Sequence, residues 1–179
     1  MGVSTHPQDN AHALWIADLS ISTLLLFRDQ RFRGYCILSF AARRATSLES
    51  LSDDEYRAFV GDLRAASRAI RQALTPDHMN YELLGNSEPH LHWHIVPRYK
   101  TDPRWGQPIW EGWPRGEFTV NRHTLAPAEY DAIVQAIRQQ LTGLDALWAD
   151  MDRLAEEITA QWTGNHSAVD AVRQGKREL

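Results

Sequence analysis

Residues 80–99 of the chain read NYELLGNSEPHLHWHIVPRY and place three histidines, His90, His92 and His94, at alternate positions. Successive side chains of a β-strand point to opposite faces of the sheet, and each residue advances the chain by about 3.3 Å. In a strand the three imidazoles would therefore form a row on one face, spaced about 6.6 Å apart. The pattern predicts a strand over residues 90–97, whose other face would carry Leu91, Trp93 and Ile95.

The segment before the histidines predicts a strand followed by a turn. Residues 80–85 are apolar-rich, and residues 85–89 (GNSEP) are mostly of the types found in turns. Gly85 allows the backbone to approach a phosphate closely, and Asn86 and Ser87 offer hydrogen-bond donors to its oxygens. The turn is therefore a candidate phosphate-binding loop, and a simple turn fits the same three residues equally well.

Other segments of the first half predict two strands and a helix. Residues 20–27 and 34–40 are short runs of β-branched, aromatic and aliphatic residues, which indicates two neighbouring antiparallel strands. Ser52 and Glu55 have the spacing of a capping box, and apolar residues recur at helical intervals after them. A helix is predicted over residues 53–74.

The chain after the histidines predicts a loop and then helices. Residues 101–117 are rich in proline and glycine and carry Trp105, Trp110 and Trp113. This composition indicates an ordered loop with aromatic anchors, for which we favour a role in the core or an interface over stacking on a substrate. Two apolar stripes on either side of Gly143 predict two carboxy-terminal helices.

Length, charge and cysteine content limit the classes of protein. The 179 residues predict one domain over residues 1–179, with a core at about 14–120 and a helical extension at about 124–163. The net charge of −4 gives no general attraction for nucleic acid, and no apolar run is long enough to span a membrane. The single cysteine, Cys36, and an amino terminus without a basic segment leading into an apolar run predict a cytoplasmic protein.

A row of three imidazoles suits two kinds of chemistry. Two histidines at positions i and i+2 of a strand can hold zinc through neutral nitrogens. The outer pair would lie about 13 Å apart along the strand, however, and Glu88 is the only adjacent carboxylate. A neutral imidazole can instead attack phosphorus in line and form a phosphoramidate intermediate. We favour this second chemistry, with the middle histidine as nucleophile because it has a neighbour on each side.

Residues 80–99 resemble the signature of the histidine-triad (HIT) family, which is His-x-His-x-His followed by two apolar residues, here Ile95 and Val96. The resemblance covers about residues 14–110, and the chain most resembles bacterial HIT hydrolases that act on diadenosine polyphosphates. It implies an α+β, HIT-like fold, in which a long helix packs on a twisted antiparallel sheet, with extra carboxy-terminal helices in this chain. It also implies a homodimer.

The resemblance also implies roles for individual residues. His92 would be the nucleophile, His94 would contact phosphate oxygens, and His90 would belong to the supporting hydrogen-bond network. The expected substrate-binding residues are Asn80, Gly85, Asn86, Ser87 and Asp29. Of these, Asn80 would lie beside the scissile bond and Asp29 would bind ribose. One departure is that Arg43-Arg44-Ala45 stands where the family often has a histidine after a basic pair.

These observations predict a nucleotide hydrolase or transferase that needs no metal or cofactor. It would cleave a phosphoanhydride or phosphoramidate bond at the α-phosphate of an adenine-type nucleotide conjugate, through a covalent nucleotidyl-histidine. Its expected partner is a small nucleotide rather than nucleic acid or a membrane. Two alternatives stay open: a nucleotide-binding regulatory protein with little turnover, and a metalloprotein that uses two of the histidines.

Overall fold

The computed structural model describes residues 6–102, 105–111 and 123–161. The chain divides into two compact units, with the boundary after Leu144. The first unit contains the sheet, the histidines and the first turns of the last helix. Among the described residues, no helix is both long and apolar enough to cross a membrane.

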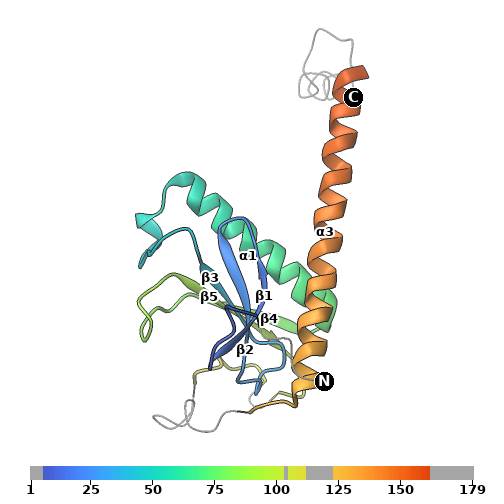
Figure 1. The fold of residues 1–179 in the computed structure, drawn as a ribbon. Coiled ribbons are helices and arrows are strands. Elements are labelled where there is room, and N and C mark those ends of the chain that lie inside the picture. The colour runs from blue at the N-terminus through green and yellow to red at the C-terminus, as the bar shows by residue number, and fades with distance from the viewer. Residues whose placement is uncertain (1–5, 103–104, 112–122, 162–179) are drawn as a thin grey trace, which may run out of the picture. The chain divides into compact units, whose positions relative to one another are not determined.

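A five-stranded antiparallel sheet forms the centre of the first unit, in the order β1-β2-β3-β5-β4 (Figure 1). The predicted strands over residues 20–27, 34–40, 80–85 and 90–97 are all present, with shifted ends. The first strand was not predicted. The observed bounds are β1 Ala13–Asp18, β2 Ser22–Phe27, β3 Cys36–Phe40, β4 His78–Glu82 and β5 His92–Arg98.

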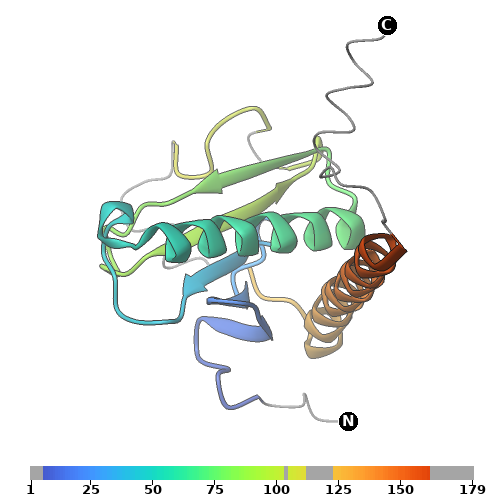
Figure 2. The same cartoon turned by 90° about the horizontal axis from the view of Figure 1, so that it is seen from above.

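The predicted long helix is confirmed as α1, Asp53–Leu74, and it follows a short 3-10 turn, Leu48–Ser50. The capping box is present, because the Ser52 hydroxyl accepts a hydrogen bond from the Glu55 N–H and the Glu55 carboxylate accepts one from the Ser52 N–H. The helix lies across one face of the sheet (Figure 2). Its buried side chains and those of the strands form the main hydrophobic core.

The opposite face of the sheet carries a smaller hydrophobic cluster. Buried Val96 from β5 meets Phe32 and Tyr35 from the β2–β3 connection and Ile109 from the loop after β5. These irregular segments cover the second face, whereas a regular helix covers the first. His92 and His94 alternate with Trp93 and Ile95 along β5, so they lie on this second face.

One continuous helix, α3 Pro127–Gln161, follows where two helices were predicted, so that prediction is wrong. Glycine costs a helix only about 1 kcal/mol relative to alanine, and the favourable residues around Gly143 outweigh that cost. The first turns of α3 join the main core through Ile133 and Ile137. They are also anchored by the Tyr130 hydroxyl, which donates to the carbonyl oxygen of Arg28 at 2.5 Å.

Candidate active site around the histidine row

Strand β5 carries two of the three histidines. His92 and His94 pair with Ser39 and Ile37 of β3, and their ring centroids lie 4.8 Å apart. His90 precedes the strand, so the prediction of three imidazoles along one strand is wrong. The reason is that β3 ends at Phe40, whose N–H makes the last bond to this segment, at the Leu91 carbonyl, while the Leu91 N–H donates to the Ala45 carbonyl at 2.8 Å.

The His90 imidazole is held by backbone groups at both nitrogens. Its Nε2 lies 2.7 Å from the Phe40 carbonyl oxygen, and its Nδ1 lies 3.4 Å from the Ala45 nitrogen. A carbonyl oxygen only accepts hydrogen bonds, so Nε2 carries the proton and Nδ1 accepts from the Ala45 N–H. The His90 ring therefore links the end of β3 to residue Ala45 through backbone groups, and its supporting role stays a prediction.

His92 is oriented by a single backbone contact. Its Nδ1 lies 2.7 Å from the carbonyl oxygen of His90. Because that oxygen accepts, Nδ1 carries a proton, and in the neutral form of the ring Nε2 is the nitrogen with the lone pair. A neutral imidazole in this tautomer has the nucleophilic nitrogen that attack on phosphorus requires.

His94 contacts a tyrosine rather than a backbone group. Its Nδ1 lies 2.6 Å from the hydroxyl oxygen of Tyr35. Burial, with a smaller effect of His92 when that ring is protonated, lowers the pKa of His94 to about 4, and burial strongly raises the pKa of Tyr35. Both side chains are therefore uncharged near neutral pH.

A cavity of about 440 Å³ opens over these side chains. His92 and His94 line it together with the loop of residues 84–88 and three aromatic side chains, Phe27, Tyr35 and Trp110. The predicted phosphate-binding residues of the loop, Gly85, Asn86 and Ser87, thus meet the histidines. Gly85 has a φ of +68°, a conformation that favours glycine over any residue with a Cβ.

Two other predicted substrate residues do not line this cavity. The side-chain oxygen of Asn80 accepts a hydrogen bond from Arg98 at 2.8 Å, and Asn80 lines a neighbouring hollow of about 400 Å³ with Trp105. Asp29 is 2% exposed and forms an ion pair with Arg31 at 2.7 Å. Ribose binding by Asp29 and a scissile-bond contact by Asn80 therefore stay predictions.

Sequence reasoning missed Phe27 and Tyr35 as residues of the cavity, and for Trp110 it favoured a role in the core or an interface. Tyr35, Ile37 and Ser39 are alternate residues, so their side chains lie on the same face as the histidines. This alternation in residues 35–39 is the sequence signal that could have identified Tyr35. Trp110 contacts His94 edge to face with centroids 5.5 Å apart, and its indole N–H donates to the Glu82 carboxylate. Trp105 lies away from the cavity, and Trp113 lies outside the described residues.

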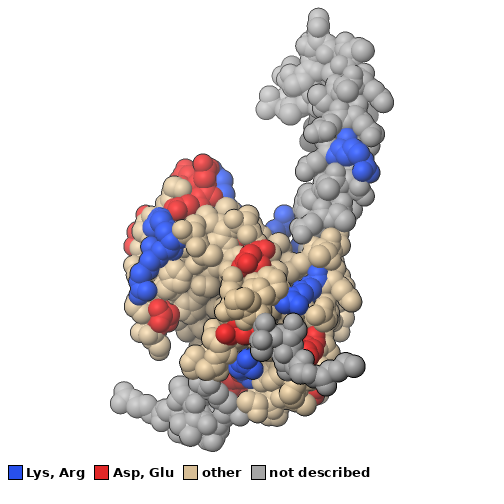
Figure 3. All heavy atoms as spheres, in the orientation of Figure 1, with Lys and Arg blue, Asp and Glu red and all other residues tan. Residues whose placement is uncertain are grey.

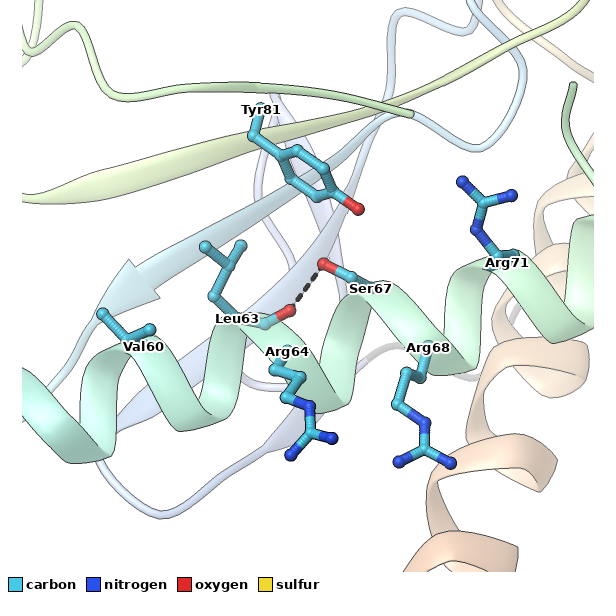
Figure 4. A pocket seen from close by; sticks show the side chains of 7 residues that line it. All are labelled: Val60, Leu63, Arg64, Ser67, Arg68, Arg71 and Tyr81. Carbon is cyan, nitrogen blue, oxygen red and sulfur yellow. Dashed lines mark hydrogen bonds between the residues drawn. The ribbon is translucent and has the colours of Figure 1, made fainter. Parts of the chain in front are cut away.

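A different hollow of about 320 Å³ lies between α1 and β4, where Figure 4 shows the side chains around it. Arg64, Arg68 and Arg71 line it with Tyr81 and Val60, among others. All of its lining residues are described, and none is a histidine, cysteine or carboxylate. Its Ser67 hydroxyl donates to the Leu63 carbonyl oxygen, and no histidine or carboxylate lines the hollow to act as a base, so the histidine cavity is the candidate active site.

The residues described do not include a ready-made metal centre. Within residues 6–102, 105–111 and 123–161, no group of three or more His, Cys, Asp or Glu side chains is placed to hold an ion. His90 and His92 each use a ring nitrogen on a backbone carbonyl, and His94 uses one on Tyr35. The remaining ring nitrogens of His92 and His94 are the ones to consider for chemistry.

Fold and site together define a class of protein in which two histidines of an antiparallel sheet and a glycine-containing loop line the same cavity. The chain belongs to the histidine-triad family, because the HIT domain matches residues 6–101, more than half of its length. Membership supports a nucleotide-binding, hydrolase-type function in general. No curated protein matches the chain.

Solved structures of histidine-triad proteins share the fold. One from Bradyrhizobium japonicum is 23% identical, with a TM-score of 0.66 over 77% of this chain and 97% of its own. One from Marinobacter aquaeolei is 22% identical, with a TM-score of 0.65 over 78% and 96%. One from Sinorhizobium meliloti is 19% identical, with a TM-score of 0.65 over 78% and 99%. At these identities the likeness establishes the α+β, HIT-like fold and does not assign a substrate.

Proposed function

We propose that the chain hydrolyses a nucleotide conjugate at its α-phosphate through a covalent nucleotidyl-histidine on His92. The observation that carries this proposal is the 2.7 Å contact between His92 Nδ1 and the His90 carbonyl oxygen. In the neutral ring this contact leaves Nε2 unprotonated, and His92 lines the cavity. An adenine nucleotide linked through a phosphoanhydride or a phosphoramidate is the proposed substrate.

The reaction has two displacement steps at one phosphorus atom. Nε2 of His92 forms a bond to the α-phosphorus while the bond to the leaving group breaks, and that group departs with the electron pair and gains a proton. Water then attacks the same phosphorus and gives up a proton, and the phosphorus–nitrogen bond breaks with its electrons returning to Nε2. The product is a nucleoside monophosphate, and His92 is regenerated.

The cavity supplies groups that would stabilise the charge on phosphate. Ser87 and Asn86 line it from the loop after β4 and can donate hydrogen bonds to phosphate oxygens. The charged residue of its lining is Glu88, which is exposed and lies 3.9 Å from Arg44. Figure 3 shows basic and acidic side chains interspersed on the face drawn, which suits a small ligand better than an extended polyanion.

The test is release of AMP from diadenosine tetraphosphate and from adenosine phosphoramidate, with a chelator present. We expect His92→Ala to lower turnover by at least about 10³-fold, since the covalent step needs this nitrogen. His78→Ala is the matched control, because His78 is an exposed histidine of β4 that does not line the cavity.

The outcomes separate the hypotheses. Loss of AMP release only in His92→Ala supports the nucleophile, and the faster substrate names the subclass. An inactive wild-type chain, or equal activity in His92→Ala, would contradict the proposal for these substrates. In that case equilibrium binding of AMP and elemental analysis of the purified protein would test the regulatory and metalloprotein alternatives.

We also propose a homodimer, as the family resemblance implies. Exposed apolar side chains gather on α1 and β4, where Tyr56, Val60 and Tyr81 are 48%, 37% and 44% exposed. Strand β4 is an edge of the described sheet, and unpaired strand edges are suited to association. Light scattering should report a dimer that Val60→Glu converts to a monomer, whereas a monomeric wild-type chain would overturn the proposal.

A further inference from the structure

Tyr35 occupies an unusual place for a hydroxyl group. It lies one residue before β3, is 1% exposed, and sits in the cluster of Phe32, Val96 and Ile109 on the histidine face. Its hydroxyl oxygen reaches Nδ1 of His94 at 2.6 Å. Apolar packing thus aims one polar atom at one ring nitrogen.

The direction of this hydrogen bond follows from what surrounds the hydroxyl. Burial makes loss of the phenolic proton unfavourable, so Tyr35 keeps it. If His94 Nδ1–H were the donor, the tyrosine proton would need another acceptor, and among the described residues the hydroxyl contacts only His94. A buried hydroxyl proton without an acceptor is unfavourable. The hydroxyl therefore donates and Nδ1 of His94 accepts.

We infer that Tyr35 is a positioning residue, whose hydroxyl holds His94 in the tautomer with the proton on Nε2 and so presents an N–H donor to the phosphate that His92 attacks. This inference rests on the proposed function. The two neighbouring imidazoles, in their neutral forms, then have opposite tautomers. The carbonyl at Nδ1 of His92 leaves its Nε2 unprotonated, whereas the hydroxyl at Nδ1 of His94 leaves its Nε2 protonated. One ring supplies the nucleophile and the other supplies the donor.

The experiment replaces Tyr35 with phenylalanine, which keeps the packing and removes the hydroxyl. Tyr99→Phe is the matched control, because the Tyr99 hydroxyl donates to the Leu74 carbonyl at 3.4 Å, outside the cavity. Nitrogen-15 NMR of histidine-labelled protein reads the tautomer and the pKa of His94 directly, and steady-state kinetics read kcat and KM. His92 and Glu82 are the other titratable groups beside His94, and both remain in the variants.

In Tyr35→Phe we expect kcat to fall about tenfold with KM changed less than about twofold, because the donor acts on the reacting phosphate. The His94 ring should become a mixture of tautomers, because the hydroxyl that donates to its Nδ1 is gone. Tyr99→Phe should resemble the wild type in each measurement.

The inference is overturned if wild-type His94 carries its proton on Nδ1, or if Tyr35→Phe leaves both the His94 signals and kcat unchanged. The NMR measurement needs no substrate. A chain with no turnover would therefore contradict the proposed function while the tautomer of His94 is still tested on its own.

Discussion

The two faces of the sheet are covered by different means. Under α1, fully buried side chains such as Phe59 and Ile70 form a continuous apolar layer. On the histidine face the cover consists of loop segments, and buried Tyr35 there hydrogen-bonds with His94. The buried face of α1 is mostly apolar, and its buried carboxylate, Asp62, accepts hydrogen bonds from Ser20 and Ile21, whereas the irregular segments direct a hydroxyl at a histidine. The comparison teaches that stability should be concentrated under α1 and chemistry on the other face.

The largest expected effect tests the α1 face. Phe59→Ala should lower the free energy of unfolding by about 3–5 kcal/mol, because it removes a fully buried ring that contacts Phe40 and Trp93. Urea denaturation followed by circular dichroism measures the change. A loss under about 1 kcal/mol would show that this layer does not dominate stability.

A smaller loss of stability is expected on the histidine face, which loop segments cover. Asp29→Asn should cost about 3 kcal/mol, because it leaves the guanidinium of Arg31, which is only 8% exposed, without its carboxylate. The KM of the folded variant should stay within about twofold of the wild type, since Asp29 does not line the cavity. A KM raised tenfold at unchanged stability would instead assign Asp29 to the ribose.

The smallest effect concerns the pH dependence of stability. The pKa of His94 is about 4 in the folded chain and 6.5 without perturbation. Between these pH values the unfolded chain therefore binds a proton at His94 that the folded chain does not bind. Stability should therefore fall as the pH drops from 6.5 toward 4. After allowance for the partial exposure of the ring, the wild type should lose about 2 kcal/mol more than His94→Gln.

Denaturant titrations of both proteins at pH 7 and pH 4.5 measure this difference. Equal losses in the two proteins would mean that the ring of His94 is freely protonated in the folded chain. The histidine face would then be more accessible to water than the contacts of His94 with Tyr35 and Trp110 indicate.

Local patterns predicted some elements closely and failed for others. The bounds of α1 and its capping box were predicted correctly, because helix periodicity and the Ser52–Glu55 spacing act within one or two turns. The failures are equally physical. Strand β1 was missed, Gly143 was taken for a helix break, and His90 was placed in a strand although β3 offers it no partner beyond Phe40.

The sequence by itself determined the alternation that puts His92 and His94 on one face, the loop that contributes Gly85 and Ser87 to the cavity, and the family. The tertiary structure decided which nitrogen of each imidazole carries the proton. Tyr35 and His94 are 59 residues apart, and no local pattern specifies a contact over that separation. Only the pairing of β3 with β5 brings the hydroxyl to the ring, because strand register fixes which side chains meet.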